Sequence, residues 1–188
     1  DVIVRWQNTG TTPLMITLLL CRTNMAMKLC EQGADIHRKK SSGRDALLFA
    51  MQSRNKGNID SEMMIDYLLQ HGAKPSLLHL DMALHHRDAE FVSRLIPLCH
   101  PSVFAKDWLP IHRMATWKGK LAGSERARAL LKQLINVGYD VNQKDKWDQL
   151  PLHLSLSPDC PCGMTKNLIE LGARVDIPNR YGYMPLLD

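Results

Sequence analysis

The sequence lacks the features that would assign it a function at once. Its longest apolar run, from Pro13 to Cys21, contains Thr17, whereas a membrane-spanning helix needs about 18 apolar residues in succession. The phosphate-binding loop G-x-x-x-x-G-K-[ST], the nucleophile elbow G-x-S-x-G and the zinc-protease motif H-E-x-x-H are all absent. We therefore expect no membrane span, no enzymatic activity in this chain and no cofactor.

Cysteine is too sparse and too irregular for a disulfide framework. There are five cysteines, an odd number, and their spacing follows no pattern. This usage predicts reduced thiols in an intracellular protein, cytoplasmic or nuclear. Cys160-Pro-Cys162 is the closest pair, but C-x-C is shorter than the usual C-x₂₋₄-C spacing of zinc sites. We expect a surface loop there and no metal site.

The bulk composition is that of an ordinary folded protein. Hydrophobic residues make up 45% and charged residues 23% of the chain. The net charge of +5 permits an acidic partner without requiring one. The chain starts without Met, inside repeat-like sequence, and ends just after another repeat opening. We therefore expect it to be a fragment of a longer protein.

A repeat runs along the chain. Gly33, Gly138 and Gly172 are each followed 13 residues later by the position of a "P-L" opening, at Ala46, Pro151 and Pro185. The interval from Gly72 to Gly138 is 66 residues, which is two periods of 33, so one degraded repeat must lie between them. A fixed period of this length indicates a stack of similar supersecondary units.

The best-formed unit contains Asp140-Val141-Asn142 and then Leu150-Pro151-Leu152-His153, and related openings occur at Thr12-Pro13-Leu14 and at 109–112. These motifs resemble the ankyrin repeat, a β-turn followed by two helices. The resemblance implies an all-α ankyrin-repeat solenoid of about five helix-turn-helix repeats plus a terminal half-repeat, with short β-turn fingers, in a single domain over 1–188. The repeats are expected at about 6–38, 39–75, 76–102, 103–143, 144–178 and 179–188.

Several units depart from the regular pattern. Longer connections between helices are expected at 54–58 and 118–124, and a short or missing finger between Gly72 and the third repeat, whose first helix we place at Ala83–Asp88. Cys99 takes the usual Gly position there, and Pro97 and Pro101 should distort the exit. Thr12 and Ser124 are expected to cap helices. The resemblance also implies that His112 and His153 bond backbone groups between neighbouring turns.

In ankyrin arrays the turns and the exposed side of the first helices line a concave groove, and all four tryptophans map to this surface. Trp6, Trp108 and Trp147 fall in or beside turns, and Trp117 ends a first helix. Tryptophan and arginine dominate interface hot spots. Together with nearby basic and aromatic positions, the predicted partner-binding residues are Trp6, Trp108, Trp117, Trp147, Arg44, Lys106, Arg113, Lys146, Tyr181 and His86.

These positions favour a protein–protein interaction module with a scaffold or adaptor role. Its partner would be a peptide segment with apolar anchors and acidic flanks. One alternative is a tryptophan cage for methyl-lysine, which the basic surroundings disfavour. Another is a nucleic-acid surface on which bases stack, for which the net charge is modest.

Overall fold

The computed structural model describes residues 10–55, 60–99, 109–157 and 162–185. Within these ranges the chain is helical and contains no β-strand. None of the helices there has the length and apolarity that crossing a membrane requires. The chain divides into two compact units, residues 1–79 and 80–188, which we call the first unit and the second unit. The predicted single domain over the whole length stays a prediction.

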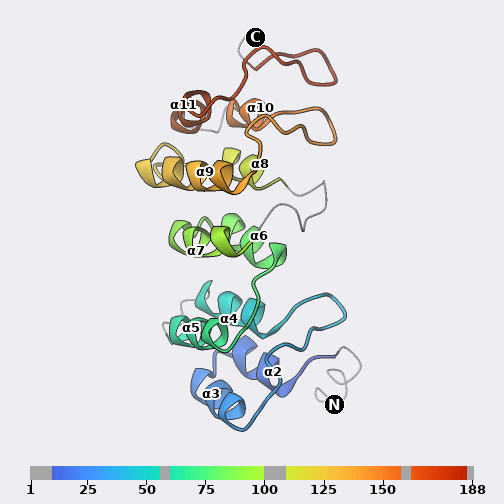
Figure 1. Ribbon diagram of the computed structural model, residues 1–188, viewed down its shortest axis with the longest axis vertical. Coiled ribbons are helices and arrows are strands. Elements are labelled where there is room, and N and C mark those ends of the chain that lie inside the picture. The colour runs from blue at the N-terminus through green and yellow to red at the C-terminus, as the bar shows by residue number, and fades with distance from the viewer. Residues whose placement is uncertain (1–9, 56–59, 100–108, 158–161, 186–188) are drawn as a thin grey trace. The chain divides into compact units, whose positions relative to one another are not determined.

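The first unit stacks two helix pairs (Figure 1). The inner helices α2 and α4 pack on each other, and each also packs on its own outer helix, α3 or α5. The two outer helices are in contact as well. The helices are α2 (Pro13–Leu19), α3 (Thr23–Glu31), α4 (Ala46–Asn55) and α5 (Ser61–Gln70).

Side-chain caps fix where the inner helices begin. The Thr12 hydroxyl accepts a hydrogen bond from the Met15 amide at 3.2 Å, with Pro13 in the first turn, as the sequence predicts. Asp45 does the same for α4 by accepting from the Leu48 amide at 3.0 Å. Leu14 and Leu47 are then buried at about 1% exposure, so the capped turn points an apolar residue into the core.

The second unit repeats this arrangement. The inner helices α8 and α10 pack on each other, and they pack on the outer helices α9 and α11 respectively. Outer helix α7 contacts α9, which in turn contacts α11. The elements are α6 (Leu77–His85), whose first three residues belong to the first unit, α7 (Ala89–Leu95), the 3₁₀ helix η1 (Ile96–Leu98), α8 (Pro110–Ala115), α9 (Glu125–Val137), α10 (Pro151–Ser155) and α11 (Cys162–Glu170).

The third repeat is the degraded one. Only a short turn separates Gly72 from α6, as predicted, but α6 begins at Leu77, six residues earlier than the expected start at Ala83. Pro97 lies in the 3₁₀ helix that distorts the exit, and Cys99 has φ −119° where the other repeats place a left-handed glycine. These irregularities were predicted, whereas Pro101 lies outside the described residues.

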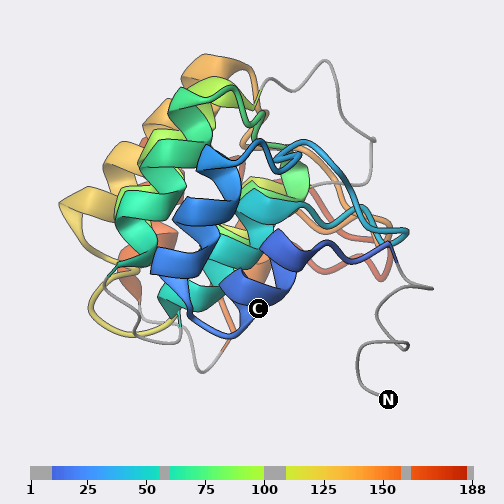
Figure 2. The ribbon, with the colours of Figure 1, turned by 90° about the horizontal axis from the view of Figure 1, so that it is seen from below.

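Short fingers precede α4 and α10, a third follows α11, and all three share one hydrogen-bonding pattern. The amide of the first finger residue donates to the carbonyl four residues later, in 40–44 at 2.7 Å, in 145–149 at 3.0 Å and in 179–183 at 2.9 Å. The fourth residue is left-handed each time: Gly43, Asp148 or Gly182. In the second unit the fingers at 145–149 and 179–183 extend away from α9 and α11 (Figures 1 and 2).

The long connection 118–124 was predicted, and its end touches the start of α11. Ser124 caps α9 by accepting from the Ala127 amide at 3.2 Å, as expected. Just before this cap, the backbone of Gly123 meets Gly163 of α11, so closely that a Cβ on Gly163 would lie 2.4 Å from the Cα of Gly123. Glycine is therefore required at position 163 by packing. The other predicted connection, at 54–58, lies largely outside the described residues.

We expect Gly163→Ala to destabilise the chain by about 1 to 3 kcal/mol, the usual cost of overpacking. Alanine is the better helix former by about 1 kcal/mol, so helix propensity alone predicts the opposite sign. Urea unfolding measures the difference, with Lys166→Ala on the exposed side of α11 as the control. A Gly163→Ala chain as stable as the wild type, or more so, would show that the two backbones do not need this contact.

Candidate functional site

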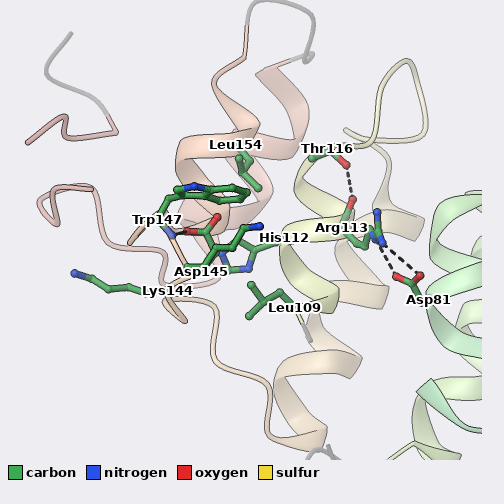
Figure 3. Close-up of a pocket in the computed structure, with 10 residues that line it drawn as sticks. Asp81, Leu109, His112, Arg113, Thr116, Lys144, Asp145, Trp147 and Leu154 are labelled. Atoms are coloured by element: carbon green, nitrogen blue, oxygen red, sulfur yellow. Dashed lines mark hydrogen bonds and ion pairs between the residues drawn. The ribbon is translucent and has the colours of Figure 1, made fainter. Parts of the chain in front are cut away.

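An open hollow of about 800 Å³ lies on the inner side of the second unit (Figure 3). Its walls come from the inner helices α8 and α10, from α6 and from the finger at 145–149. The lining residues are Asp81, Leu109, His112, Arg113, Thr116, Lys144, Asp145, Lys146, Trp147 and Leu154. They include the three kinds of group that recognise a peptide: apolar side chains, an indole and charges of both signs.

The finger holds Trp147 over this hollow. A carboxylate oxygen of Asp145 accepts hydrogen bonds from the amides of Trp147 and Gln149, each at 2.8 Å. This Asx-type turn fixes the backbone on both sides of the indole. The Trp147 side chain remains 43% exposed, and the Lys146 ammonium lies 4.0 Å from the centroid of its ring as a cation–π contact.

Two histidines fasten successive fingers to the inner helices. His112 Nε2 lies 2.9 Å from the carbonyl oxygen of Gln149, and His153 Nε2 lies 3.1 Å from that of Tyr183. The His153 ring also accepts at Nδ1 from the Leu150 amide, so its hydrogen is on Nε2 and it donates to Tyr183. The structural role predicted for both histidines is confirmed.

Burial lowers the pKa of His112 below its ordinary value, and the hydrogen bond to Gln149 and the nearby Asp145 charge only partly oppose this. The uncharged ring is therefore the form that the folded unit favours. The same ring lines the hollow and holds the finger through its bond to Gln149.

Ion pairs order the charged edge of the hollow. Arg113 donates from Nε and Nη2 to the two carboxylate oxygens of Asp81, at 2.9 and 3.3 Å. Lys144 lies 3.8 Å from the Asp148 carboxylate. Figure 3 shows the Arg113–Asp81 pair at one end of the hollow and the finger at the other. Such half-exposed pairs contribute little stability, but they orient the side chains that a ligand would meet.

Three predicted binding residues come together here: Arg113, Lys146 and Trp147. Trp117 does not, and its predicted position on the surface is wrong. It is only 2% exposed, and its indole Nε1 donates to the Leu84 carbonyl of α6 at 3.0 Å. A buried indole that finds an acceptor is a favourable core residue, which accounts for this position.

The other predicted residues do not line the hollow. Arg44 and Tyr181 are exposed in fingers, Arg44 in the first unit, and His86 is exposed just after α6. Trp6, Lys106 and Trp108 lie outside the described residues. The predicted contributions of all these residues to partner binding stay predictions.

Sequence reasoning missed Leu109 and Leu154, which supply most of the aliphatic lining. Leu109 directly precedes Pro110 in one helix opening, and Leu154 directly follows His153 in the next. Their places beside these motifs were a signal that could have found them. It also missed His79 in the first unit, whose Nε2 lies 2.9 Å from the Asp45 carboxylate. The opening Ser76-Leu77-Leu78-His79 lacks the proline that marks the other repeats.

No metal centre is visible among the residues that the structure describes, since none of their His, Cys, Asp and Glu side chains gather in groups of three or more. The expected loop at Cys160-Pro-Cys162 falls largely outside those residues.

Trp117→Ala should destabilise the chain by about 3 to 5 kcal/mol, because it removes a large buried ring. Trp117→Phe should cost less, about 1 kcal/mol for the lost indole hydrogen bond, because the Leu84 carbonyl still accepts from the Arg87 amide at 3.1 Å. Trp147→Ala serves as the exposed control and should cost about 1 kcal/mol or less. Urea midpoints decide the matter: equal losses for Trp117→Ala and Trp147→Ala would contradict the core assignment.

The stability contributed by neutral His112 should be fully present above its unfolded pKa, near 6.5, and should be lost as the pH falls below it. The free energy of unfolding decreases on acidification because the unfolded state binds the proton more readily than the folded state does. Urea unfolding of wild type and His112→Asn at about pH 7.5 and about pH 5.5 isolates this contribution from other histidines. The variant should lose less stability on acidification, and an equal or larger loss would contradict the argument.

No known protein-family profile matches the chain, and no curated protein matches it in sequence. Among solved structures of similar fold is the human ASB11 ankyrin repeat domain, with a TM-score of 0.55 and 16% sequence identity. The similarity covers 94% of this chain and 90% of that domain. Identity this low establishes the fold and nothing about the partner. The stacked helix pairs, the fingers and this likeness show that the chain has an ankyrin-repeat fold.

Proposed function

We propose that the hollow of the second unit binds an extended or helical segment of another protein, so that the chain acts as a non-catalytic scaffold or adaptor module. Ankyrin-repeat domains are generally protein-interaction modules, which supports the broad assignment. The assignment of binding to this hollow rests on the half-exposed Trp147 ring, which a hydrogen-bonded finger holds over the hollow. We place this activity inside the cell, because five cysteines, an odd number with irregular spacing, are the usage expected of reduced thiols.

The hollow suits an apolar anchor residue of the partner. Leu109 at the start of α8, Leu154 on α10 and Trp147 on the finger reach it from three separate elements. In Figure 3 the Trp147 ring lies beside Leu154, with Leu109 beyond His112. Since the backbone of each element is already fixed by hydrogen bonds, a ligand would order little of the protein on binding. Pre-organisation of this kind turns a modest apolar area into useful affinity.

The charges at the hollow favour acidic residues beside that anchor. Arg113 and Lys144 already have carboxylate neighbours, so they leave little net charge for a ligand. Lys146 contacts the Trp147 ring instead, and among the described residues no carboxylate forms an ion pair with it. An acidic side chain of the partner would supply this missing charge, and complementary charge fixes register and raises the association rate.

The two other candidate functions receive less support. A methyl-lysine cage needs several aromatic walls, whereas Trp147 is the one indole or phenol that lines the hollow among the described residues. Its ring already carries the Lys146 cation, which would repel a second one. Nucleic acid would need a row of stacking rings along a uniformly basic groove, but Asp81 and Asp145 also line this one.

Selection from a random-peptide display library against the purified chain tests the proposal. We expect enriched peptides to share an apolar anchor, and Trp147→Ala to weaken their binding by about tenfold or more, as for an interface hot spot. Met63→Ala is the matched control, because Met63 is 65% exposed on α5 in the first unit. Its affinity should equal that of the wild type.

If the peptides bound Trp147→Ala as tightly as the wild type, the hollow would be excluded as their binding site. A library that yielded no enriched peptide at all would contradict the proposed function. Unfolding curves of both variants belong to the same experiment, since a Trp147→Ala chain that had lost its structure would say nothing about the contact.

A further inference from the structure

Two fingers of the second unit present the same pair of residue types at the same position. In finger 145–149 the second and third residues are Lys146 and Trp147, and in finger 179–183 they are Arg180 and Tyr181. Each finger is fixed by its first side chain: Asn179 accepts from the amides of Tyr181 and Tyr183 at 2.9 and 3.1 Å, as Asp145 does in the other finger. A basic residue followed by an exposed aromatic residue thus occurs at the same position in two successive repeats.

Hydrogen bonds from Arg180 join the two fingers. Arg180 donates from Nη2 to the Lys146 carbonyl at 2.8 Å, and its own amide donates to the Trp147 carbonyl at 3.3 Å. The guanidinium is therefore anchored against the backbone that carries the Lys146 side chain. Tyr181, the next residue on the same finger, is 67% exposed. We call the four residues on these two joined fingers the fingertip strip, of which the first two line the hollow: Lys146, Trp147, Arg180 and Tyr181.

The two cations of the strip differ from the basic residues near them in their ion pairing. Nearby basic residues are paired, Lys144 with Asp148 at 3.8 Å and Arg174 with Asp176 at 2.7 Å. Among the residues that the structure describes, neither Lys146 nor Arg180 forms an ion pair. Two like charges held on adjacent fingers repel each other, and a bound anion would relieve this repulsion. The strip is thus suited to a ligand that carries negative charge at one place.

We propose that Lys146 and Arg180 form a subsite for two consecutive acidic residues, Asp or Glu, of the segment whose apolar anchor occupies the hollow. The inference rests on the proposed function and specifies its partner: Trp147 and Tyr181 contact the apolar parts of the acidic stretch while the two cations bind its carboxylates. A peptide fits better than a nucleic acid because exposed carboxylates of Asp148 and Asp176 lie on the same loops. These carboxylates would repel the phosphates that a nucleic acid carries all along its length, whereas a peptide can place its negative charge at the subsite alone.

A double-mutant cycle tests the subsite with the peptides selected on the wild-type chain. On the wild type, replacing the acidic pair of a selected peptide by Gln-Gln should weaken binding about tenfold, in line with charge-assisted contacts. On Lys146→Gln/Arg180→Gln, the same replacement should change affinity little, because the cations that it acts on are gone. Glutamine retains amide donors, and the unfolding midpoint of this variant verifies that both fingers remain in place.

Lys132→Gln/Lys166→Gln is the matched control, since it removes the same charge from exposed positions on the outer helices α9 and α11. On this control the peptide change should again cost about tenfold. Equal losses on the subsite variant and the wild type would overturn the subsite.

Wild-type selection that returns apolar anchors without acidic pairs would also overturn the subsite, yet it would leave the proposed function standing. A labelled single-stranded oligonucleotide provides the remaining comparison. If it bound the wild type more tightly than the selected peptides and lost that affinity on the subsite variant, nucleic acid would replace the acidic peptide as the ligand.

Discussion

The candidate binding face of the second unit depends on one recurring contact, the hydrogen bond from an inner-helix histidine to a finger carbonyl. His112 reaches Gln149 and His153 reaches Tyr183, so each finger is tied to the helix of the preceding repeat. Without this tie a finger would be a surface loop held mainly at its base. With this hydrogen bond, the finger holds Trp147 beside α8 and α10, and the hollow is formed without a ligand.

Local chemistry inside each finger complements this contact. Asp145 and Asn179 use side-chain oxygens to hold two amides each, and Asp148 and Gly182 take the left-handed conformation that closes the turn. A non-glycine residue rarely adopts that conformation, but Asp tolerates it better than most. Histidine and finger together thus give a rigid support on which the exposed residues can vary, as expected where function resides in sites placed on a common fold.

Much of the fold could be predicted because the responsible signals are local. The 33-residue period, the Thr12 and Ser124 caps and the roles of His112 and His153 all follow from short motifs that form the same structure wherever they occur. The early start of α6 was missed, since its opening at Ser76 lacks the proline that marks other repeats. The burial of Trp117 was missed for a different reason: side-chain direction there depends on the Leu84 carbonyl, 33 residues away in sequence.

The candidate site was predictable in part for the same reason. Finger positions such as Lys146 and Trp147 can be read from the motif, and Arg113 from its place after His112. Leu109 and Leu154 join them only through the packing of α8 on α10, and Arg180 gains its neighbour only through the contact between two fingers. Tertiary contacts of this kind do not appear in the periodicity of the sequence. The hollow and the fingertip strip could therefore be found only from the structure.

The central claim is that the ligand lies between the inner helices and the finger. Amide hydrogen–deuterium exchange of the chain, with and without a saturating selected peptide, tests it most directly. The account predicts that slowed exchange concentrates at 109–116, 144–149 and 151–155, with α9 and α11 unchanged on their outer side. Protection confined to α9 and α11, with the finger exchanging as before, would contradict it.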